Sequence, residues 1–422
     1  MLGKPVLMKK IISNIALCIL ILLYAGAAMK EVELVPIIFV YTFVPKVCTE
    51  GNIFPSYIRY ALSQAVESQS HTEIIFGANF ADCKALSIND SYVEGVTLYD
   101  TSAFYKTFRL SKFSEIANSI FQTDGKGELW MTSALRFFVL EDIMLSMGYQ
   151  SCFHVEADNM LYGDLYYLLS TLKSKYIGFA STPLTDHTYI TASVMWISNI
   201  SYISNFNDML LTFGDNESIS WNNYLSWLRP QACCKLGGFL QDSAGMGIRP
   251  YAINEMSILS FYRFTYPQLF HLFPVVPQYS YILNQFTCNI SDYEPNGTKV
   301  ISTSSNGIFD PNSWGQFLGG TSSKRGRNKG FTDGSHISGQ AIRMSNCRPL
   351  FLCTNTSLID VFHKIDNNNV DKRCYMIPYV ECNDTNSVVT KTPIYNLHVH
   401  AKDTRSFRSL PCECSKKKLI KL

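Results

Sequence analysis

Charge is scarce in this sequence, and its basic and acidic residues nearly balance. Charged residues make up 17% of the 422 residues, hydrophobic residues make up 47%, and the formal net charge is +2. A chain with this apolar content is not a disordered polar chain. Because it has no long basic stripe interleaved with aromatic residues, it also lacks the signature of a nucleic-acid-binding protein. The length suffices for one large or two modest globular domains.

The sequence also has no internal repeat and no glycine-rich phosphate-binding loop near its first predicted strands. Val35–Phe43 and Thr72–Phe76 are apolar runs typical of buried strands, and Pro55–Ser68 between them has apolar residues at helical spacing. This order predicts a βαβ unit with parallel strands. Without a glycine-rich loop, the unit is not that of a dehydrogenase or a P-loop enzyme.

An apolar run over residues 11–29 follows three lysines within residues 1–10. The run is just long enough to cross a bilayer as a helix. The lysines predict a cytoplasmic tail at 1–10, a signal anchor at 11–29 and the remaining chain in the ER or Golgi lumen, as in a single-pass type II membrane protein. Alternatively, the small residues Ala25–Ala27 form a cleavage site, so that the run is a signal peptide and the protein is secreted.

Cysteines and glycosylation sequons agree with a lumenal or secreted body. Cys18 is the only one of 13 cysteines inside the apolar run, so twelve lie outside it. An even number suits disulfides in an oxidising compartment, although the pairing stays open. In such a compartment most N-x-S/T sequons are modifiable surface sites. They begin at Asn89, Asn199, Asn216, Asn289, Asn296, Asn355 and Asn383.

Two carboxylates follow a predicted strand in the segment FHVEADNMLYGDL, Phe153 to Leu165. The apolar residues up to Val155 predict a buried strand. In an extended backbone Glu156 and Asp158 share one face. Carboxylate oxygens are ligands that Mg²⁺ and Mn²⁺ prefer, and ligands of α/β sheets bind beyond the carboxyl ends of the strands. The pair therefore predicts half of a divalent-cation site.

A helix predicted over Leu129–Met147 precedes the acidic strand. Its apolar residues recur every three to four positions, Thr132 or Ser133 is a suitable N-cap, and Gly148 ends it. Arg136 on this helix either faces the predicted site or is a solvated or salt-bridged surface residue.

Two more carboxylates are candidates in the second half of the chain. Glu255 begins a helix predicted over Asn254–Tyr262, where it either acts on a substrate or stabilises the helix through its dipole. Asp310 lies in the segment FDPNSWGQFLGGT, Phe309 to Thr321, where it either binds a ligand or forms a turn beside Pro311.

Near the C-terminus, Pro393–Lys402 (PIYNLHVHAK) is apolar and strand-like and contains two histidines. In a strand His398 and His400 share one face. Imidazole is a frequent ligand of Mn²⁺ and Zn²⁺, so these histidines are candidate metal ligands as well as possible surface residues.

These motifs together resemble the nucleotide-sugar glycosyltransferases of the GT-A fold. In that family a helix of the type R-F-x-x-L precedes a strand that ends in D-x-D, followed by a hydrophobic residue, Gly-Asp and a helix. F-D-x-x-x-x-G-x-x-L-G-G and a C-terminal L-H-x-x-G-x-x-K also match this chain in order. Two departures are visible: Glu156 stands in the first Asp position, and no glycine lies between His398 and Lys402.

The resemblance implies an α/β fold, a GT-A type Rossmann-like mixed sheet flanked by helices and preceded by the membrane anchor. Residues 30–180 would be the nucleotide-sugar-binding half and residues 181–402 the acceptor-binding half. Residues 403–422 would be a tail rich in cysteine and lysine.

The resemblance also assigns roles to the candidates. The sugar moves from a UDP- or GDP-linked donor to an acceptor hydroxyl on a glycan, glycoprotein or glycolipid, with Mn²⁺ or Mg²⁺ as cofactor. Glu255 is the candidate acceptor-side base, and Asp310 is the candidate partner for sugar hydroxyls. The metal-ligating candidates are Glu156, Asp158, His398 and His400. The substrate-binding candidates are Arg136, Asn159, Gly319, Gly320, Arg325 and Lys402.

Several alternatives stay open at this stage. The Glu-for-Asp change also suits a lumenal carbohydrate-binding protein that kept the fold and lost turnover. A glycoside hydrolase is less favoured, because two carboxylates on one strand face lie on the same side of a substrate. Trp196 and Trp314 either stack on sugar rings or belong to the core.

Overall fold

The computed structural model divides the chain into two compact units, Met1–Leu34 and Val35–Leu422, and describes residues of the second. The predicted tail and anchor at 1–29 lie outside the described residues. Among the described residues, no helix combines the length and apolarity needed to cross a bilayer. The described residues are 35–42, 55–81, 92–121, 127–184, 189–213, 215, 217–231, 253–277, 307–320, 330, 336–344, 347–354, 374–383, 389–399, 404–408 and 411–412.

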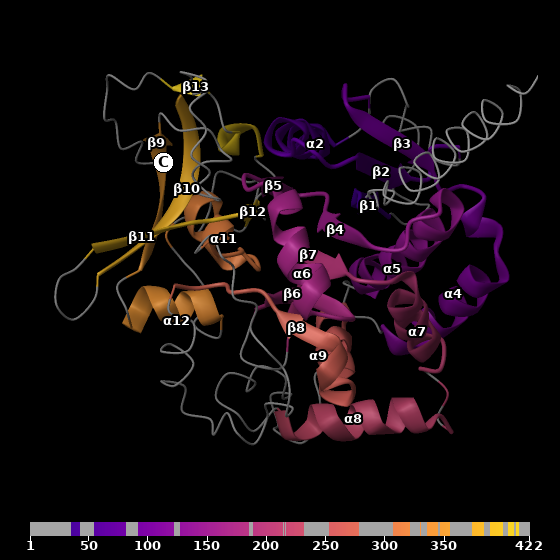
Figure 1. The fold of residues 1–422 in the computed structure, drawn as a ribbon. Helices are drawn as coiled ribbons and strands as arrows, with labels where there is room; N and C mark the ends of the chain where they lie inside the picture. Colours follow the sequence, from indigo (N-terminus) through magenta and orange to yellow (C-terminus); the bar gives the residue numbers. More distant parts are fainter. Residues whose placement is uncertain are drawn as a thin grey trace, which may run out of the picture. The chain divides into compact units, whose positions relative to one another are not determined.

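A seven-stranded mixed sheet forms the centre of this unit (Figure 1). Its strands are β1 (Ile37–Tyr41), β2 (Ile74–Ala78), β3 (Val96–Asp100), β4 (Cys152–Glu156), β6 (Phe179–Pro183), β7 (Ile190–Ile197) and β8 (Phe270–Leu272). They lie in the order β3-β2-β1-β4-β7-β6-β8. All neighbours are parallel except β7, which runs antiparallel to both β4 and β6.

Side chains alternate between two hydrophobic cores, one on each face of the sheet. Along β1, Ile37 and Phe39 belong to one core, whereas Ile38 and Val40 belong to the other. This alternation follows from the pleat of the strand, which points successive side chains to opposite faces. Because both faces are covered by helices, β1 reads in the sequence as an unbroken apolar run.

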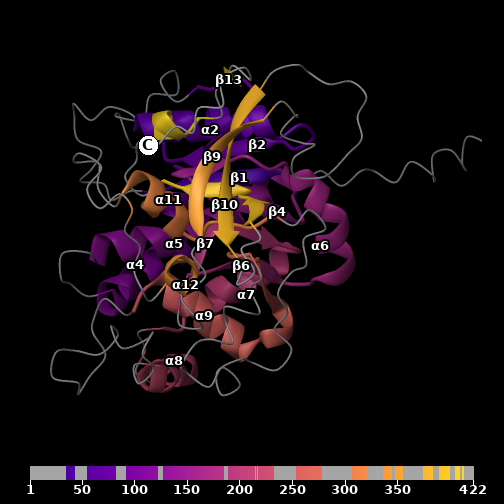
Figure 2. The same cartoon turned by 90° about the vertical axis from the view of Figure 1, so that its left-hand side faces the viewer.

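Helices cover each face of the sheet and bury their apolar stripes in these cores (Figures 1 and 2). The first core receives α2 (Ser56–Ser68), η3 (Leu165–Leu168), α6 (Leu169–Lys175), α11 (Ser313–Gly319) and α12 (Ile337–Met344). The second receives α4 (Phe108–Ile120), α5 (Gly127–Met147), α7 (Ile200–Leu210), α8 (Ile219–Gln231) and α9 (Glu255–Thr265). Short 3-10 turns are η2 (Phe104–Lys106), η6 (Pro267–Leu269) and η8 (Thr404–Phe407).

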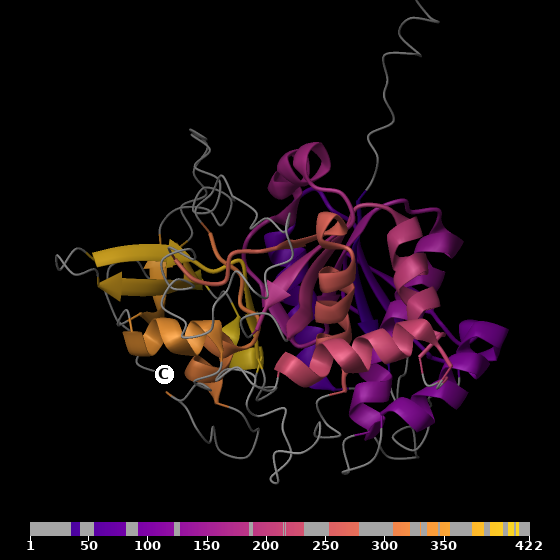
Figure 3. The same ribbon diagram turned by 90° about the horizontal axis from the view of Figure 1, so that it is seen from below.

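The C-terminal third adds strands beside the main sheet. β10 (Cys374–Asn383) pairs antiparallel with β9 (Arg348–Thr354), β11 (Val389–Pro393) and β13 (Pro411–Cys412). Figure 3 shows these orange-to-yellow elements grouped beside the indigo-to-pink main sheet. A disulfide joins Cys347 to Cys382. β12 (Asn396–His398) belongs to a separate two-stranded sheet. It pairs with β5 (Asn159–Leu161), the strand that follows β4 in the sequence.

The mixed sheet with helices on both faces fits the predicted GT-A type of fold. The predicted βαβ unit is confirmed as β1, α2 and β2, with β1 parallel to β2. The division into donor and acceptor halves at residue 180 stays a prediction.

Several predicted boundaries are wrong. The long helix starts at Gly127, so Thr132 and Ser133 lie inside it and neither is its N-cap. Thr132 satisfies its hydroxyl by donating to the Leu129 carbonyl, which lets it fit in a helix.

The chain after the acidic strand also differs from its prediction. β4 ends at Glu156, and the chain turns before Asp158, so the two carboxylates do not share one continuous strand face. Asn159–Leu161 form a short strand, because the distant β12 supplies its hydrogen-bonding partner. Within the described residues, the strand predicted over 393–402 is divided into the end of β11 at Pro393, a bridge at Ile394 and β12.

Candidate functional site

A cavity of about 290 Å³ lies at the carboxyl ends of β1 and β4. These strands are parallel, and Val40 pairs with Glu156, so their ends reach the same edge of the sheet. β7 is antiparallel, so the start of this strand, at Thr191, reaches the same edge. This is where ligands bind in α/β sheets of this kind. The lining residues are Val40, Tyr41, Thr42, Tyr57, Leu129, Trp130, Thr132, Ser133, Arg136, Glu156, Ala157, Asp158, Thr191, Glu255, Met256, Pro311, Asn312 and His398.

Three of these side chains form what we term the carboxylate–histidine group: Glu156, Asp158 and His398. One possible ligand atom from each lies within 4.8 Å of the others. His398 Nε2 is 3.2 Å from Asp158 Oδ2, and His398 Nδ1 is 3.5 Å from Glu156 Oε2. Among the described residues, this is the one group of three acidic, histidine or cysteine side chains with such spacing.

Backbone pairing brings His398 to the acidic residues from 240 positions away in the sequence. His398 stands opposite Asn159 in the β12–β5 pair. The next residue, Val399, donates its backbone N–H to the Asp158 carbonyl at 3.0 Å. The prediction that the two carboxylates and the C-terminal histidine segment meet is therefore realised for His398.

Arg136 lies at the centre of a buried charge network. Its Nη1 donates to Glu156 Oε1, and its Nη2 lies 3.3 Å from Glu255 Oε1. Of the alternatives for Arg136, the structure shows a salt-bridged residue that also lines the cavity. Burial on its own raises the pKa of the Glu156 carboxyl, but the charges of Arg136 and His398 outweigh it and hold this pKa below its usual value.

Glu255 is the first residue of α9, lines the cavity and lies next to Nη2 of Arg136. Asn254 caps this helix together with Ser257, each side chain bonding the other's backbone, which fixes the position of Glu255. Burial is the largest influence on the Glu255 carboxyl; Arg136 lowers and Glu156 raises its pKa, which comes to about 7. A carboxylate with a pKa near neutrality is suited to proton transfer.

Asp310 binds backbone and does not line the cavity. Its two carboxylate oxygens accept hydrogen bonds from the backbone N–H groups of Asn312, Trp314, Gly315 and His398, at 2.7–3.0 Å. The side chain is fully buried. The structure thus favours the turn-forming alternative for Asp310, extended by a direct contact to the backbone of His398.

Asn159 is also inside the protein, next to the carboxylate–histidine group. Its Oδ1 accepts a hydrogen bond from Asn396 Nδ2 at 2.7 Å, and Asn396 in turn binds the backbone N–H and carbonyl of Asp310. Sequence reasoning missed Asn396, whose only signal is its place two residues before His398. These amides tie β5, β12 and the loop around Asp310 together.

The glycines of the segment 309–321 have distinct roles. Gly320 follows the last residue of α11 with a φ of +85°, a backbone conformation that favours glycine. A Cβ on Gly319 would lie 2.9 Å from the Phe407 ring. Gly315, which sequence reasoning did not single out, permits the closest approach, because a Cβ there would lie 2.1 Å from the His398 carbonyl oxygen.

Other predicted residues either lie elsewhere or are outside the described part of the chain. Arg325, His400 and Lys402 lie outside the described residues. Trp196 and Trp314 are buried in the core, which confirms the core alternative for both. Sequence reasoning also missed the aromatic and apolar wall of the cavity, formed by Tyr41, Tyr57, Leu129, Trp130 and Met256.

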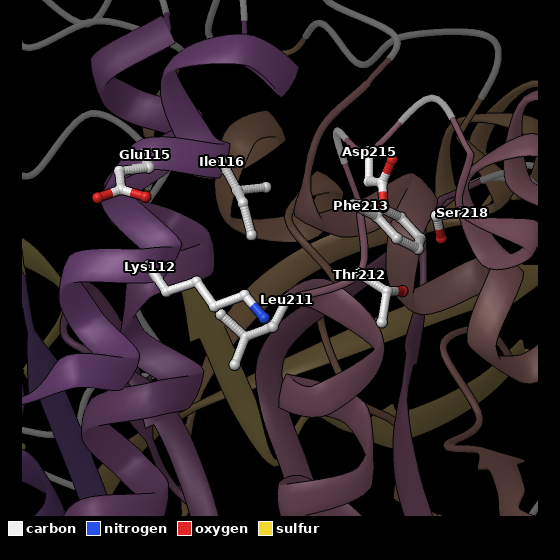
Figure 4. A pocket seen from close by; sticks show the side chains of 8 residues that line it. All are labelled: Lys112, Glu115, Ile116, Leu211, Thr212, Phe213, Asp215 and Ser218. Atoms are coloured by element: carbon white, nitrogen blue, oxygen red, sulfur yellow. The ribbon is translucent and has the colours of Figure 1, made fainter.

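A second, larger cavity of about 550 Å³ lies between α4 and the segment that follows α7. Figure 4 shows Glu115 and Asp215 on opposite sides of this cavity, with Lys112 and Leu211 between them. Its carboxylates do not converge, and no described histidine or cysteine lines it. It therefore lacks the chemistry of the cavity at the ends of β1 and β4.

The carboxylate–histidine group fits a divalent cation. Carboxylate and imidazole ligands together suit Mn²⁺, and the carboxylates alone suit Mg²⁺. Glu156 and Asp158 both line the cavity and bring negative charge to it. The donor set and its spacing therefore agree with the predicted cofactor.

Comparisons with known proteins give only distant structural likenesses. No family model and no curated protein sequence matches the chain. Mouse xyloside xylosyltransferase 1 in its apo form is similar at a TM-score of 0.32 and 11% identity, over 60% of this chain and 93% of that one. PaToxG glycosyltransferase is similar at a TM-score of 0.27 and 11% identity, over 44% of this chain and 63% of that one. The glycosyltransferase GlyE of Streptococcus pneumoniae is similar at a TM-score of 0.26 and 15% identity, over 46% of this chain and 43% of that one. At these TM-scores the assignment of function rests on the residues of the site.

Gly315→Ala is expected to displace His398. The added methyl group would lie 2.1 Å from the backbone carbonyl oxygen of His398 and 3.0 Å from Oδ2 of the buried Asp310. Overpacking of this kind costs about 1–3 kcal/mol of unfolding free energy. Chemical denaturation followed by circular dichroism measures the loss. Gly319→Ala meets only the rim of a phenyl ring and is the milder comparison; equal stability of Gly315→Ala and wild type would contradict the close approach.

Glu255→Gln is expected to change the pH dependence of stability. Because the pKa of Glu255 is about 7 in the folded state against 4.5 for an unperturbed carboxyl, only the folded state holds this proton between those pH values. The stability it provides is present below pH 4.5 and is lost as the pH rises to 7. The variant should therefore gain on the order of 3 kcal/mol relative to wild type above pH 7. Chemical denaturation at several pH values measures the unfolding free energy of both proteins, with Glu115→Gln on α4 as control. The same pH dependence of this free energy in Glu255→Gln and wild type would contradict the prediction.

Proposed function

We propose that the protein is a metal-dependent glycosyltransferase that moves a sugar from a nucleotide diphosphate donor to an acceptor hydroxyl. The observation that carries this proposal is the carboxylate–histidine group inside a cavity at the carboxyl ends of parallel strands. A divalent cation bound there supplies electrostatic stabilisation of the leaving diphosphate. Asp158 and His398, together with Glu156, are the residues that hold it.

In the proposed reaction Glu255 accepts the proton of the acceptor hydroxyl. Its carboxyl lines the cavity, and its pKa of about 7 leaves a substantial fraction deprotonated at neutral pH. Arg136 fixes the orientation of Glu255 by binding Oε1, since a guanidinium group presents its donors in a rigid plane. The capping of α9 by Asn254 limits movement of the backbone at Glu255.

Arg325 and Lys402 complete the proposal on the donor side. Both lie outside the described residues and enter it from their sequence motifs alone. Arginine binds phosphate oxygens in a bidentate manner and lysine binds them as a point charge, so the two suit a diphosphate. Lys402 lies four positions after His398, close in sequence to the carboxylate–histidine group.

Glycoside hydrolysis is the second candidate. Glu156 has a lowered and Glu255 a raised pKa, and a pair of carboxyls with separated pKa values is typical of glycosidases. However, both carboxylates bind the same guanidinium group, and a hydrolase has no need of the third member, His398, next to two carboxylates. A carbohydrate-binding protein without turnover is the remaining outcome.

We also propose that the catalytic body is lumenal and anchored through residues 11–29. The three lysines before the apolar run support this topology. The Cys347–Cys382 disulfide is of the kind that forms in an oxidising compartment. Cleavage after the run would make the protein secreted and would leave the enzymatic proposal unchanged.

Asp158→Asn is expected to abolish sugar transfer while the fold persists. The change removes a charged ligand and creates no cavity, so activity should fall at least about 100-fold with little loss of stability. Transfer from UDP- and GDP-linked sugars, with added Mn²⁺ or with EDTA, is followed by nucleotide release from the full-length protein in detergent. Asp208→Asn is the matched control, because Asp208 is an exposed residue of α7.

Three outcomes of this assay separate the candidate functions. A transferase releases nucleotide slowly without acceptor and faster with it, and only with metal. A hydrolase cleaves glycosides that lack a nucleotide and ignores EDTA, whereas a binding protein releases nothing. Transfer by Asp158→Asn at the wild-type rate under saturating donor and metal would show that the site has been assigned wrongly.

The sequons provide a test of topology in a eukaryotic host. A lumenal body should carry several N-linked glycans, so endoglycosidase treatment should lower its mass by several glycan units. Asn199 is a partly exposed residue at the start of α7 and is one of the expected sites. N-terminal sequencing should find the apolar run still attached. A body without any glycan would contradict lumenal exposure.

A further inference from the structure

Glu156 has a different environment from the other carboxylate of the group. One of its oxygens, Oε1, receives Arg136 Nη1, and the other, Oε2, lies 3.5 Å from His398 Nδ1. Both oxygens thus face positively charged or N–H-bearing side chains. Asp158 faces the opposite nitrogen of the same imidazole, with Oδ2 at 3.2 Å from His398 Nε2. The histidine ring therefore lies between the two carboxylates.

The two ring nitrogens of a metal-binding histidine have separate tasks. One nitrogen coordinates the metal, and the other usually donates its N–H to a carboxylate, which fixes the tautomer and the orientation of the ring. Here Nδ1 faces Glu156 and Nε2 faces Asp158. Nε2 is within hydrogen-bonding distance of Asp158, whereas the contact of Nδ1 with Glu156 at 3.5 Å is an ion-pair contact. Because a metal between Nε2 and Asp158 would replace that hydrogen bond, these distances alone do not assign the orienting carboxylate.

The position of Arg136 makes this choice. Arg136 is 7% exposed; its guanidinium contacts Glu156 through Nη1 and Glu255 through Nη2. A divalent cation bound at Glu156 would lie next to this buried positive charge, and repulsion between charges is strong where water is excluded. A cation held by Asp158 and His398 Nε2 would instead be bound through the ring nitrogen that does not face Glu156, the carboxylate in contact with Arg136.

We infer that Glu156 is a positioning residue and that Asp158 and Nε2 of His398 are the metal ligands of the carboxylate–histidine group. In this assignment Glu156 holds Arg136 through Oε1, and its Oε2, 3.5 Å from Nδ1, would accept the Nδ1–H of the imidazole in the metal-bound protein. This inference rests on the proposed metal-dependent function and refines it. It accounts for glutamate in place of the first aspartate of the D-x-D pattern, because the longer side chain reaches His398 and Arg136 together.

The length of the side chain gives the inference a sharp consequence. Aspartate at position 156 is shorter by one methylene group, about 1.5 Å. If Glu156 is a positioning residue, Glu156→Asp releases His398, Arg136 or both. Glu156→Gln keeps the reach and one oxygen for the Nδ1–H, and it loses only the ionic contact with Arg136. If Glu156 is a ligand, the order reverses, because aspartate restores a D-x-D pair and glutamine removes a charged ligand.

The experiment is calorimetric titration of the full-length protein in detergent with Mn²⁺ alone. We expect Asp158→Asn to weaken Mn²⁺ binding at least about 100-fold, Glu156→Gln to weaken it about tenfold, and Glu156→Asp to weaken it more than Glu156→Gln. Asp208→Asn on α7 is the control for loss of an acidic residue. Thermal unfolding of each variant without metal shows whether it is folded. Glu156→Gln keeps the length of the glutamate side chain and removes its charge, so it separates the effect of length from the effect of charge.

Pulsed EPR of the Mn²⁺-loaded protein supplies a second readout. Coupling of Mn²⁺ to a histidine nitrogen should be present in wild type, persist in Glu156→Gln and vanish in His398→Gln. Glu156→Asp binding Mn²⁺ as tightly as wild type, together with Glu156→Gln losing as much affinity as Asp158→Asn, would overturn the positioning role. Unchanged affinity in Asp158→Asn would instead overturn the metal site itself, so the failure of this inference and the failure of the proposed function are distinguishable.

Discussion

The buried carboxylate of Asp310 is the interaction on which the site depends. It accepts backbone hydrogen bonds from three residues of its own loop and from His398, which lies 88 positions further along the chain. Burial raises the pKa of this carboxyl, while the N–H groups of Gly315, Trp314 and His398 favour its charged form. Removal of a carboxylate from water is costly unless such bonds replace its hydration. The loop, α11 and β12 are therefore held at one point, and this point positions His398 beside Asp158.

Arg136 has the corresponding role for the charges that line the cavity. The carboxylates of Glu156 and Glu255 both bind the guanidinium group of Arg136, which lines the cavity. Loss of the shared arginine from such a network costs about 3–5 kcal/mol, because uncompensated carboxylate charge is left behind. The same network separates the two carboxyls chemically: Glu156 stays ionised, and Glu255 titrates near neutrality. One arginine thus connects the proposed metal site to the proposed base.

The sequence predicted those parts of the site that depend on local pattern. Apolar runs and helical spacing located β1, α2 and β2, and the end of β4 was found because two carboxylates follow an apolar strand. The pairing of His398 with Asn159 and the link from Asn396 to Asn159 join residues more than 200 positions apart. No periodicity reports such contacts. The role of Gly315 was missed for the same reason, because only the fold shows that the His398 carbonyl oxygen lies against it.

The energetics of the cavity argue for function over a merely structural role. Asp158, Arg136 and Glu255 are each less than 8% exposed, and apolar residues of similar volume would fill such a space at lower desolvation cost. Ionisable groups gathered in a cavity with shifted pKa values are typical of functional sites. The positive charge of Arg136 offsets part of the repulsion between the carboxylates, so the fold tolerates the group without a cation. In the proposed reaction Asp158 and His398 would already be in place for a cation and its diphosphate ligand, so little reorganisation would remain.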